Sequence, residues 1–112
     1  MSLYALVFLM IAVVGLELGS VINDSQTIDE AVHIATGFSY LDSGDFRLNV
    51  EHPPLIKELA ALPLLFLGLY FPYTHPGFIN DDQWAVAPAF LFENTADADT
   101  ILLASRVTVL LL

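Results

Sequence analysis

The stretch LYALVFLMIAVVGLELGSVI, residues 3–22, is the longest apolar segment of this chain and gives the strongest indication of its fold class. It is almost entirely apolar and carries a single charge, Glu17. A helix of about 20 such residues crosses the hydrocarbon core of a bilayer. A cleaved signal peptide would want a basic start, and no Lys or Arg precedes residue 3. We therefore predict a retained transmembrane helix over residues 1–22, in which Glu17 either reaches the interface or faces a polar cavity.

Composition narrows the classes of partner and chemistry. The chain has 112 residues, is 56% hydrophobic and contains 13 acidic against 3 basic side chains, for a formal charge of -10. Twelve of the acids fall in residues 23–99. No basic patch exists, which excludes nucleic acid as a partner. The chain has no cysteine, which excludes disulfides and thiolate metal sites.

The last residues, 107–112, are hydrophobic and follow Asn94-Thr95-Ala96-Asp97-Ala98-Asp99, a segment suited to start a helix. We predict that residues 100–112 begin a second transmembrane helix that is cut off at Leu112. The sequence then represents the N-terminal part of a larger membrane protein.

Two further helices are expected between these spans. Thr27 and Glu30 have the spacing of a capping box, which predicts a helix over about residues 28–41. Ile28, Val32 and Ala35 fall on one side of it, and the other side carries Asp29, His33, Thr36 and Tyr40. This pattern indicates an amphipathic helix that lies on the membrane surface.

The second helix follows a short extended piece, residues 46–50. Pro53-Pro54 favours a helix start, and the expected helix covers about residues 55–70. Its apolar part is short for a span, so we expect an interfacial segment rather than a crossing. Residues 71–89, rich in proline, are expected to form an ordered loop with aromatic contacts to the headgroup region.

The predicted fold class is an all-α membrane protein: a transmembrane helix, a loop over residues 23–99 with two juxtamembrane amphipathic helices, and the start of a second transmembrane helix. Neither flank of the loop, 23–40 or 82–99, contains a Lys or Arg. Cytoplasmic flanks usually carry bases. We therefore expect the loop to be extracytoplasmic.

Several motifs together resemble the N-terminal region of polyprenyl-phosphate-dependent glycosyltransferases of the GT-C fold. That family includes the protein O-mannosyltransferases and the aminoarabinose lipid A transferases. The resemblance covers roughly residues 5–112. The motifs are Asp29-Glu30-x-x-His33, Gly37-x-x-Tyr40, Gly44-Asp45-Phe46, Glu51-His52-Pro53-Pro54-Leu55-x-Lys57, Ala60-Ala61-x-Pro63-Leu64 and Asn94-x-x-Asp97-x-Asp99-x-Ile101-Leu102-x-x-x-Arg106.

The resemblance implies a lipid-linked sugar donor and an integral protein of a bacterial or archaeal cell (inner) membrane, with the loop facing outside. Asp29 matches the aspartate that acts as general base or orients the acceptor. Glu51 matches the acidic residue before Pro-Pro and is a tentative ligand for a divalent metal ion of unknown identity. Aminoarabinose-type relatives have Lys after that acid, whereas this chain has His52, as in mannosyltransferase-like members.

The other candidate residues are expected to bind the substrate, and each has a structural alternative. Glu30 can instead complete the capping box. His33, four residues after Asp29, can instead orient Asp29 or Glu30 through a hydrogen bond. His52 is held rigid by the two prolines that follow, which suits a positioning or binding group.

Two basic residues complete the predicted site. Lys57 can pair with a phosphate, or form an ion pair with Glu58 or Asp45. Arg106 can contact the donor phosphate, or extend to the interface.

From these observations we predict the N-terminal part of an integral membrane glycosyltransferase, inactive as this segment alone. It would move a sugar from a polyprenyl phosphate to an acceptor hydroxyl. One rival is a non-enzymatic, membrane-anchored acidic module that binds cations or a partner protein. Another is a secreted helical domain that follows a cleaved signal peptide.

Overall fold

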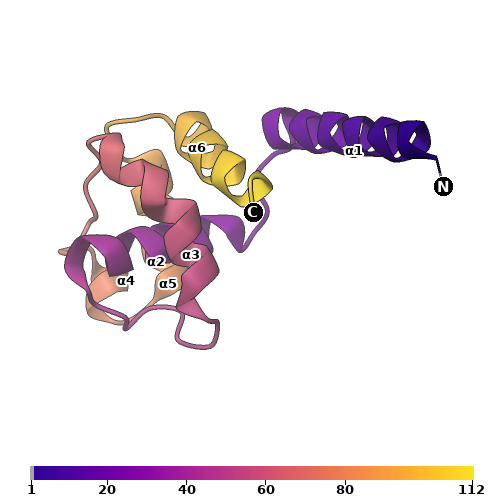
Figure 1. Ribbon diagram of the computed structural model, residues 1–112. Coiled ribbons are helices and arrows are strands. Elements are labelled where there is room, and N and C mark those ends of the chain that lie inside the picture. The colour runs from indigo at the N-terminus through magenta and orange to yellow at the C-terminus, as the bar shows by residue number, and fades with distance from the viewer. Residues whose placement is uncertain (1) are drawn as a thin grey trace.

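The computed structural model describes residues 2–112, and within this range every regular element is helical. Figure 1 shows one long helix standing apart from a compact body made by the other elements. The elements are α1 (Leu3–Asn23), α2 (Glu30–Ser43), α3 (Pro54–Ala61), the 3-10 helix η1 (Leu62–Phe66), α4 (Pro76–Ile79), α5 (Gln83–Phe92) and α6 (Ala98–Leu110). The expected all-α class is confirmed.

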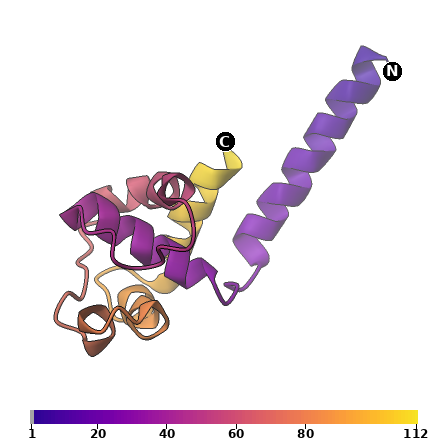
Figure 2. The same cartoon turned by 90° about the horizontal axis from the view of Figure 1, so that it is seen from below.

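Helix α1 is separate from the hydrophobic core. None of its residues is buried, and it meets the body mainly through α6. Figure 2, seen from below, shows α1 projecting away from the body after a short linker. Among residues 2–112 it is the one helix long and apolar enough to cross a membrane. Because apolar side chains over such a length are costly to leave in water, this helix fits a membrane environment.

Helix α2 is the centre of the body and packs against α3 and α5. The expectation of one apolar and one polar face was wrong for its middle, because Thr36, Ser39 and Tyr40 are buried as well as the apolar residues. The hydroxyls of Ser39 and Tyr40 donate to the backbone carbonyls of Thr36 and Leu48, which offsets the cost of burying them. Ile28, expected on the apolar side, is instead 87% exposed. Helix α2 is therefore a core helix, not a surface helix.

A glycine sets how closely α2 approaches α3. A Cβ atom added at Gly37 would lie 2.1 Å from the backbone oxygen of Lys57. No larger residue fits there without moving α3. Gly37 thus fixes the separation of the two helices that carry most of the candidate site.

Helix α3 begins at Pro54 as expected, because proline is well suited to the first position of a helix. The expected continuation to residue 70 was wrong. Pro63 has no N–H to continue the α-helical ladder, and the chain tightens into η1 from Leu62 to Phe66. Gly68 then adopts a left-handed φ of 66° and ends the helical segment.

The outer face of α3 and η1 leaves several large apolar side chains exposed: Leu55, Ile56, Leu62, Leu65 and Phe66. This exposure agrees with an interfacial position for the segment, which stays a prediction.

The segment 71–89 is not a loop as predicted, because it contains α4 and most of α5. Asp82 accepts hydrogen bonds from the N–H groups of Trp84 and Ala85 and so caps α5. Pro88 lies inside α5, yet the helix persists because its neighbours Val86 and Phe90 are buried against the rest of the body. The aromatic residues that were expected at the headgroups instead include core members, Phe71 and Phe78.

Helix α6 starts where the sequence indicated. The Asp97 side chain accepts from the N–H and the hydroxyl of Thr100, and these bonds hold the pKa of Asp97 below its ordinary value. Buried Ile101 and Leu102 then attach the start of α6 to the core, against α3 and η1. The expected helix start is confirmed here, and Asp97 and Asp99 are both exposed.

The segment 46–50, expected to be extended, forms no strand. Leu48 and Asn49 are buried, and Asn49 has a positive φ of 49°. This irregular turn leads directly into the Glu51-His52 pair.

Candidate functional site

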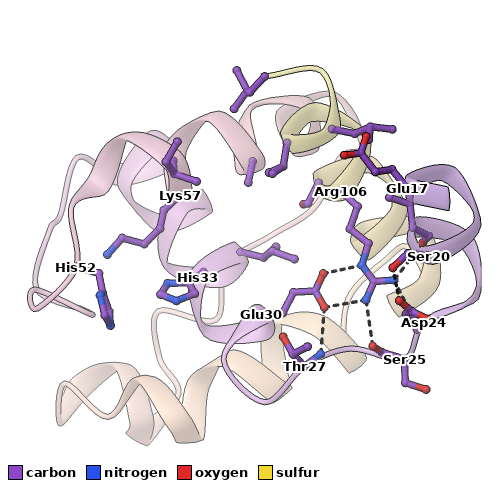
Figure 3. Close-up of a pocket in the computed structure, with 18 of the residues that line it drawn as sticks. Glu17, Ser20, Asp24, Ser25, Thr27, Glu30, His33, His52, Lys57 and Arg106 are labelled. Carbon is purple, nitrogen blue, oxygen red and sulfur yellow. Dashed lines mark hydrogen bonds and ion pairs between the residues drawn. The ribbon is translucent and has the colours of Figure 1, made fainter. Parts of the chain in front are cut away.

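A cavity of about 930 Å³ lies between α1, α2, α3 and α6. Figure 3 shows polar side chains from all sides of it. The charged or titratable lining residues are Glu17, Asp24, Glu30, His33, His52, Lys57 and Arg106, and apolar residues from the same helices fill the remaining wall. The cavity therefore combines apolar walls with polar and titratable side chains.

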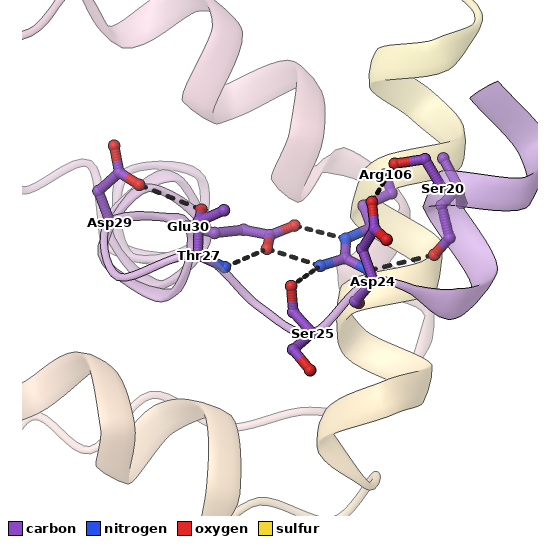
Figure 4. Close-up of polar contacts among 8 residues, drawn as sticks. Ser20, Asp24, Ser25, Thr27, Asp29, Glu30 and Arg106 are labelled. Carbon is purple, nitrogen blue, oxygen red and sulfur yellow. Dashed lines mark hydrogen bonds and ion pairs between the residues drawn. The ribbon is translucent and has the colours of Figure 1, made fainter. Parts of the chain in front are cut away.

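Arg106 is the most heavily bonded side chain at this cavity (Figure 4). Its Nε and NH2 groups donate to the two carboxylate oxygens of Glu30, at 2.6 and 2.8 Å. The remaining N–H groups donate to three backbone carbonyls at the end of α1 and in the linker: those of Val21, Asp24 and Ser25. A guanidinium has five N–H donors, and Arg106 uses all of them.

This arrangement changes the expected roles of Arg106 and Glu30. All five N–H donors of Arg106 are bonded within the protein, so it keeps no free donor for a phosphate. Glu30 accepts from the Thr27 N–H at 3.2 Å, which is half of the expected capping box, while its main partner is Arg106. Both residues join α6, α2 and the α1 linker.

Asp29, the predicted base, forms no ion pair or helix cap comparable to the bonds between Glu30 and Arg106. Its carboxylate caps no helix N–H, and its side chain is 60% exposed. It accepts from the Thr27 hydroxyl at 3.1 Å, and its Oδ2 lies 3.9 Å from His33 Nε2. It stands beside the cavity, next to the lining residues Glu30 and His33. A largely free carboxylate at this point can accept a proton from a hydroxyl group.

Two histidines connect the two motifs. The rings of His33 and His52 meet edge to face with centroids 5.3 Å apart. His33 Nδ1 is buried and has no hydrogen-bond partner. Contacts therefore run from Asp29 through His33 to His52, whose neighbour in the chain is Glu51. The Asp29-Glu30-x-x-His33 and Glu51-His52 motifs thus meet at their histidines, whereas Glu51 itself lies outside the cavity lining.

Glu51 has two amide partners. It accepts from Asn49 Nδ2 at 3.1 Å and from Gln83 Nε2 at 2.8 Å. The bond from Gln83 is the largest cause that holds the pKa of Glu51 below its ordinary value. Both bonds favour the charged carboxylate.

The residues present do not fit a metal site. Within residues 2–112 no group of three or more His, Asp or Glu side chains is arranged to hold a metal ion. The ligand role expected for Glu51 thus finds no second and third ligand here, and we assign no step to a metal.

Lys57 is buried, with 3% of its surface exposed. Its ammonium donates to Asn49 O at 2.8 Å, to Asn49 Oδ1 at 2.7 Å and to the Tyr40 hydroxyl at 3.4 Å. Burial lowers the pKa of Lys57. Neither predicted ion-pair partner is used: Asp45 pairs with Arg47 at 2.8 Å, and Glu58 makes no ion pair with it. The predicted pairing of Lys57 with phosphate would need one of these bonds to break.

Glu17 lines the cavity, which agrees with the alternative that placed it facing a polar space rather than only the interface. Ser105, which the sequence did not single out, is buried on the same wall and its hydroxyl has no partner. A serine inside an apolar helix gives no distinctive signal. Asn49 and Gln83 were also missed, because their importance comes from contacts with Glu51 and Lys57.

No family model matches this chain, and no curated protein or solved structure matches it.

Proposed function

We propose that this chain is the N-terminal part of a membrane glycosyltransferase that moves a sugar from a polyprenyl-phosphate donor to an acceptor hydroxyl on the extracytoplasmic side. The observation that carries the proposal is the free carboxylate of Asp29, which is exposed beside a cavity while its neighbour Glu30 is fully engaged. The motif resemblance described above supplies the reaction class.

The proposed reaction is a single displacement at the sugar C1 atom. The acceptor oxygen attacks C1, its proton passes to the Asp29 carboxylate, and a new C1–O bond forms. The bond from C1 to the phosphate oxygen breaks, and its electron pair stays on the polyprenyl phosphate. His33, 3.9 Å from the Asp29 carboxylate, would orient it.

The surroundings support a lipid-linked donor. Helix α1 has the length and composition of a membrane span, so the adjoining cavity would lie at the level where lipid and water meet. A cavity that combines apolar walls with a few polar side chains suits a prenyl chain attached to a phosphate. Since the donors of Arg106 and Lys57 are occupied, His33 and His52 are the basic groups at the cavity with capacity left for that phosphate.

The test uses the full-length protein in membranes with a polyprenyl-phosphate sugar. Asp29→Asn keeps the size of the side chain and removes the base, so transfer should fall by about 10²–10⁴-fold. The matched control is Asp99→Asn, the same change at an exposed acid in the first turn of α6. Control-like activity of Asp29→Asn, or no transfer by the wild-type protein, would reject the proposal.

A further inference from the structure

The ammonium group of Lys57 is turned into the protein. In Figure 3 its nitrogen points away from Arg106 and toward the loop that carries His52. Lysine is almost never fully buried unless it is paired. Here its acceptors are two oxygens of one residue, Asn49, and the Tyr40 hydroxyl, which itself donates to the Leu48 carbonyl. The ammonium group of Lys57 therefore bonds the turn at residues 48–49, both directly and through the Tyr40 hydroxyl.

That turn needs such support. Asn49 has a φ of 49°, in the left-handed region that non-glycine residues seldom adopt, although asparagine is enriched there. It is also 5% exposed, so its polar atoms require partners inside the protein. Lys57 supplies them by bonding both the backbone oxygen and the side-chain oxygen.

The conformation of Asn49 also constrains Glu51 and His52, because Asn49 is hydrogen-bonded to both. Asn49 Nδ2 donates to the Glu51 carboxylate at 3.1 Å, and Asn49 O accepts from the His52 N–H at 3.4 Å. Pro53 then restricts the chain on the other side, because its ring fixes φ and limits the residue before it. His52 is consequently held on one side by its bond to Asn49 and on the other by Pro53, and its ring contacts that of His33.

We infer that Lys57 is a positioning residue: by fixing the Asn49 turn it aims His52 at the side of α2 that carries His33, and it does not bind the donor phosphate. The catalytic consequence rests on the proposed function, whereas the placement of His52 does not.

The placement is tested by NMR of the imidazole groups, with this chain in detergent micelles. The chain has three histidines, so each signal can be assigned. Lys57→Met removes the cation. Asn49→Gly keeps the positive φ and the charge of Lys57 but removes the side-chain oxygen and nitrogen. Both variants should shift or broaden the His52 signals and leave those of His75 unchanged, because His75 caps the distant helix α4.

Glu58→Gln is the matched control. It removes a neighbouring charge on the same helix from a side chain that takes no part in these bonds, and it should leave the His52 signals in place. Unchanged His52 signals in a folded Asn49→Gly variant, as judged by circular dichroism, would overturn the inference. Asn49→Gly gives this decision even if Lys57→Met does not fold.

The second readout is kinetic and uses the full-length protein. Because the proposed function has His52 hold the donor phosphate, its misplacement should impair transfer to a similar degree in Lys57→Met and in Asn49→Gly, by about 10²-fold for a misplacement of about 1 Å. Impaired transfer in Lys57→Met beside wild-type transfer in a folded Asn49→Gly variant would identify Lys57 as a phosphate ligand and overturn the inference. Absence of transfer in the wild-type protein would reject the proposed function, and the imidazole spectra would still decide the placement.

Discussion

Arg106 on α6 and Glu30 at the start of α2 form a two-bond ion pair across 76 positions of sequence, at 2.6 and 2.8 Å. Their side chains are only 15% and 19% exposed. The same guanidinium bonds the carbonyls of Val21, Asp24 and Ser25. Because those carbonyls belong to the end of α1 and its linker, the ion pair fixes where α1 meets the body.

Removal of either partner should therefore destabilise the body. Arg106→Gln leaves the Glu30 carboxylate partly buried without its cation and frees three carbonyls. Because the pair is only partly buried, the expected loss is somewhat below the roughly 3–5 kcal/mol that breaking a fully buried ion pair costs. Glu30→Gln retains the bond to Thr27 but loses the charge, so we expect a smaller loss. Denaturant unfolding in micelles, followed by circular dichroism, measures both.

The double variant Glu30→Gln with Arg106→Gln separates the pair from other effects. If the residues act together, the loss in the double variant will be smaller than the sum of the two single losses. Strict additivity would show that the two side chains stabilise the fold independently. If Glu30→Gln also loses transfer severely, the cause would be the broken ion pair between Glu30 and Arg106, because Glu30 positions the neighbouring Asp29.

Local signals predicted the helix starts well. Pro54 begins α3 and Asp97 caps α6 as expected, because proline and aspartate act on the N–H groups of the first turn, within three residues. The same reliance on local signals failed at α5. Pro88 and its proline-rich surroundings indicated a loop, whereas buried Val86 and Phe90 stabilise a helix through contacts with distant segments.

The sequence predicted which residues belong to the candidate site better than it predicted the contacts that those residues make. The spacing of Asp29 and His33 correctly indicated a shared helix side, and the two side chains approach to 3.9 Å. Nothing in the spacing could show that Arg106 and Lys57 have their donors occupied, because their acceptors include backbone carbonyls that only the folded chain brings to them. A positive charge in a sequence does not reveal whether it is free.

A second prediction concerns the contact between α2 and α3. Gly37→Ala would place a Cβ atom 2.1 Å from the Lys57 carbonyl oxygen, a backbone atom that cannot rotate away. The helices must separate, so we expect a loss of about 3 kcal/mol or more, at the upper end of overpacking effects. Gly15→Ala is the matched control, since a Cβ there meets nothing within 4 Å. Equal thermal stability of the two variants would contradict the close approach.

A third prediction concerns alkaline pH. Burial, and then the hydrogen bond that the hydroxyl donates to Asp42 Oδ2 at 2.5 Å, raise the pKa of Tyr73 to about 12. The folded state then holds this proton more tightly than the unfolded state, whose tyrosine pKa is about 10. The resulting stabilisation is complete below pH 10 and is lost as the pH rises from about 10 through about 12.

Tyr73→Phe should weaken this loss of stability in the same pH window. Some dependence will remain, because burial also raises the pKa of Tyr40. Tyr4→Phe, at the exposed start of α1, is the matched control and should follow the wild-type curve. Unfolding free energies measured from neutral pH to pH 12 test the difference. A Tyr73→Phe curve parallel to wild type throughout would contradict a raised pKa.

The last prediction concerns orientation in the membrane. The segments on either side of the long loop, 23–40 and 82–99, contain no Lys or Arg, and cytoplasmic flanks usually carry them. The body should therefore face away from the cytoplasm, and the N-terminus should remain inside. The natural chain has no cysteine, so single cysteines report position without background.

Thr74→Cys places a thiol at an exposed position of the body, in a side chain that neither caps a helix nor lines the cavity. It should react with a membrane-impermeant thiol reagent in intact cells. Ser2→Cys, before the start of α1, is the matched control and should react only after lysis. The reverse pattern would show that the body is cytoplasmic, where an extracytoplasmic lipid-linked donor could not reach Asp29. Reaction of both cysteines in intact cells would show that α1 does not hold the N-terminus inside.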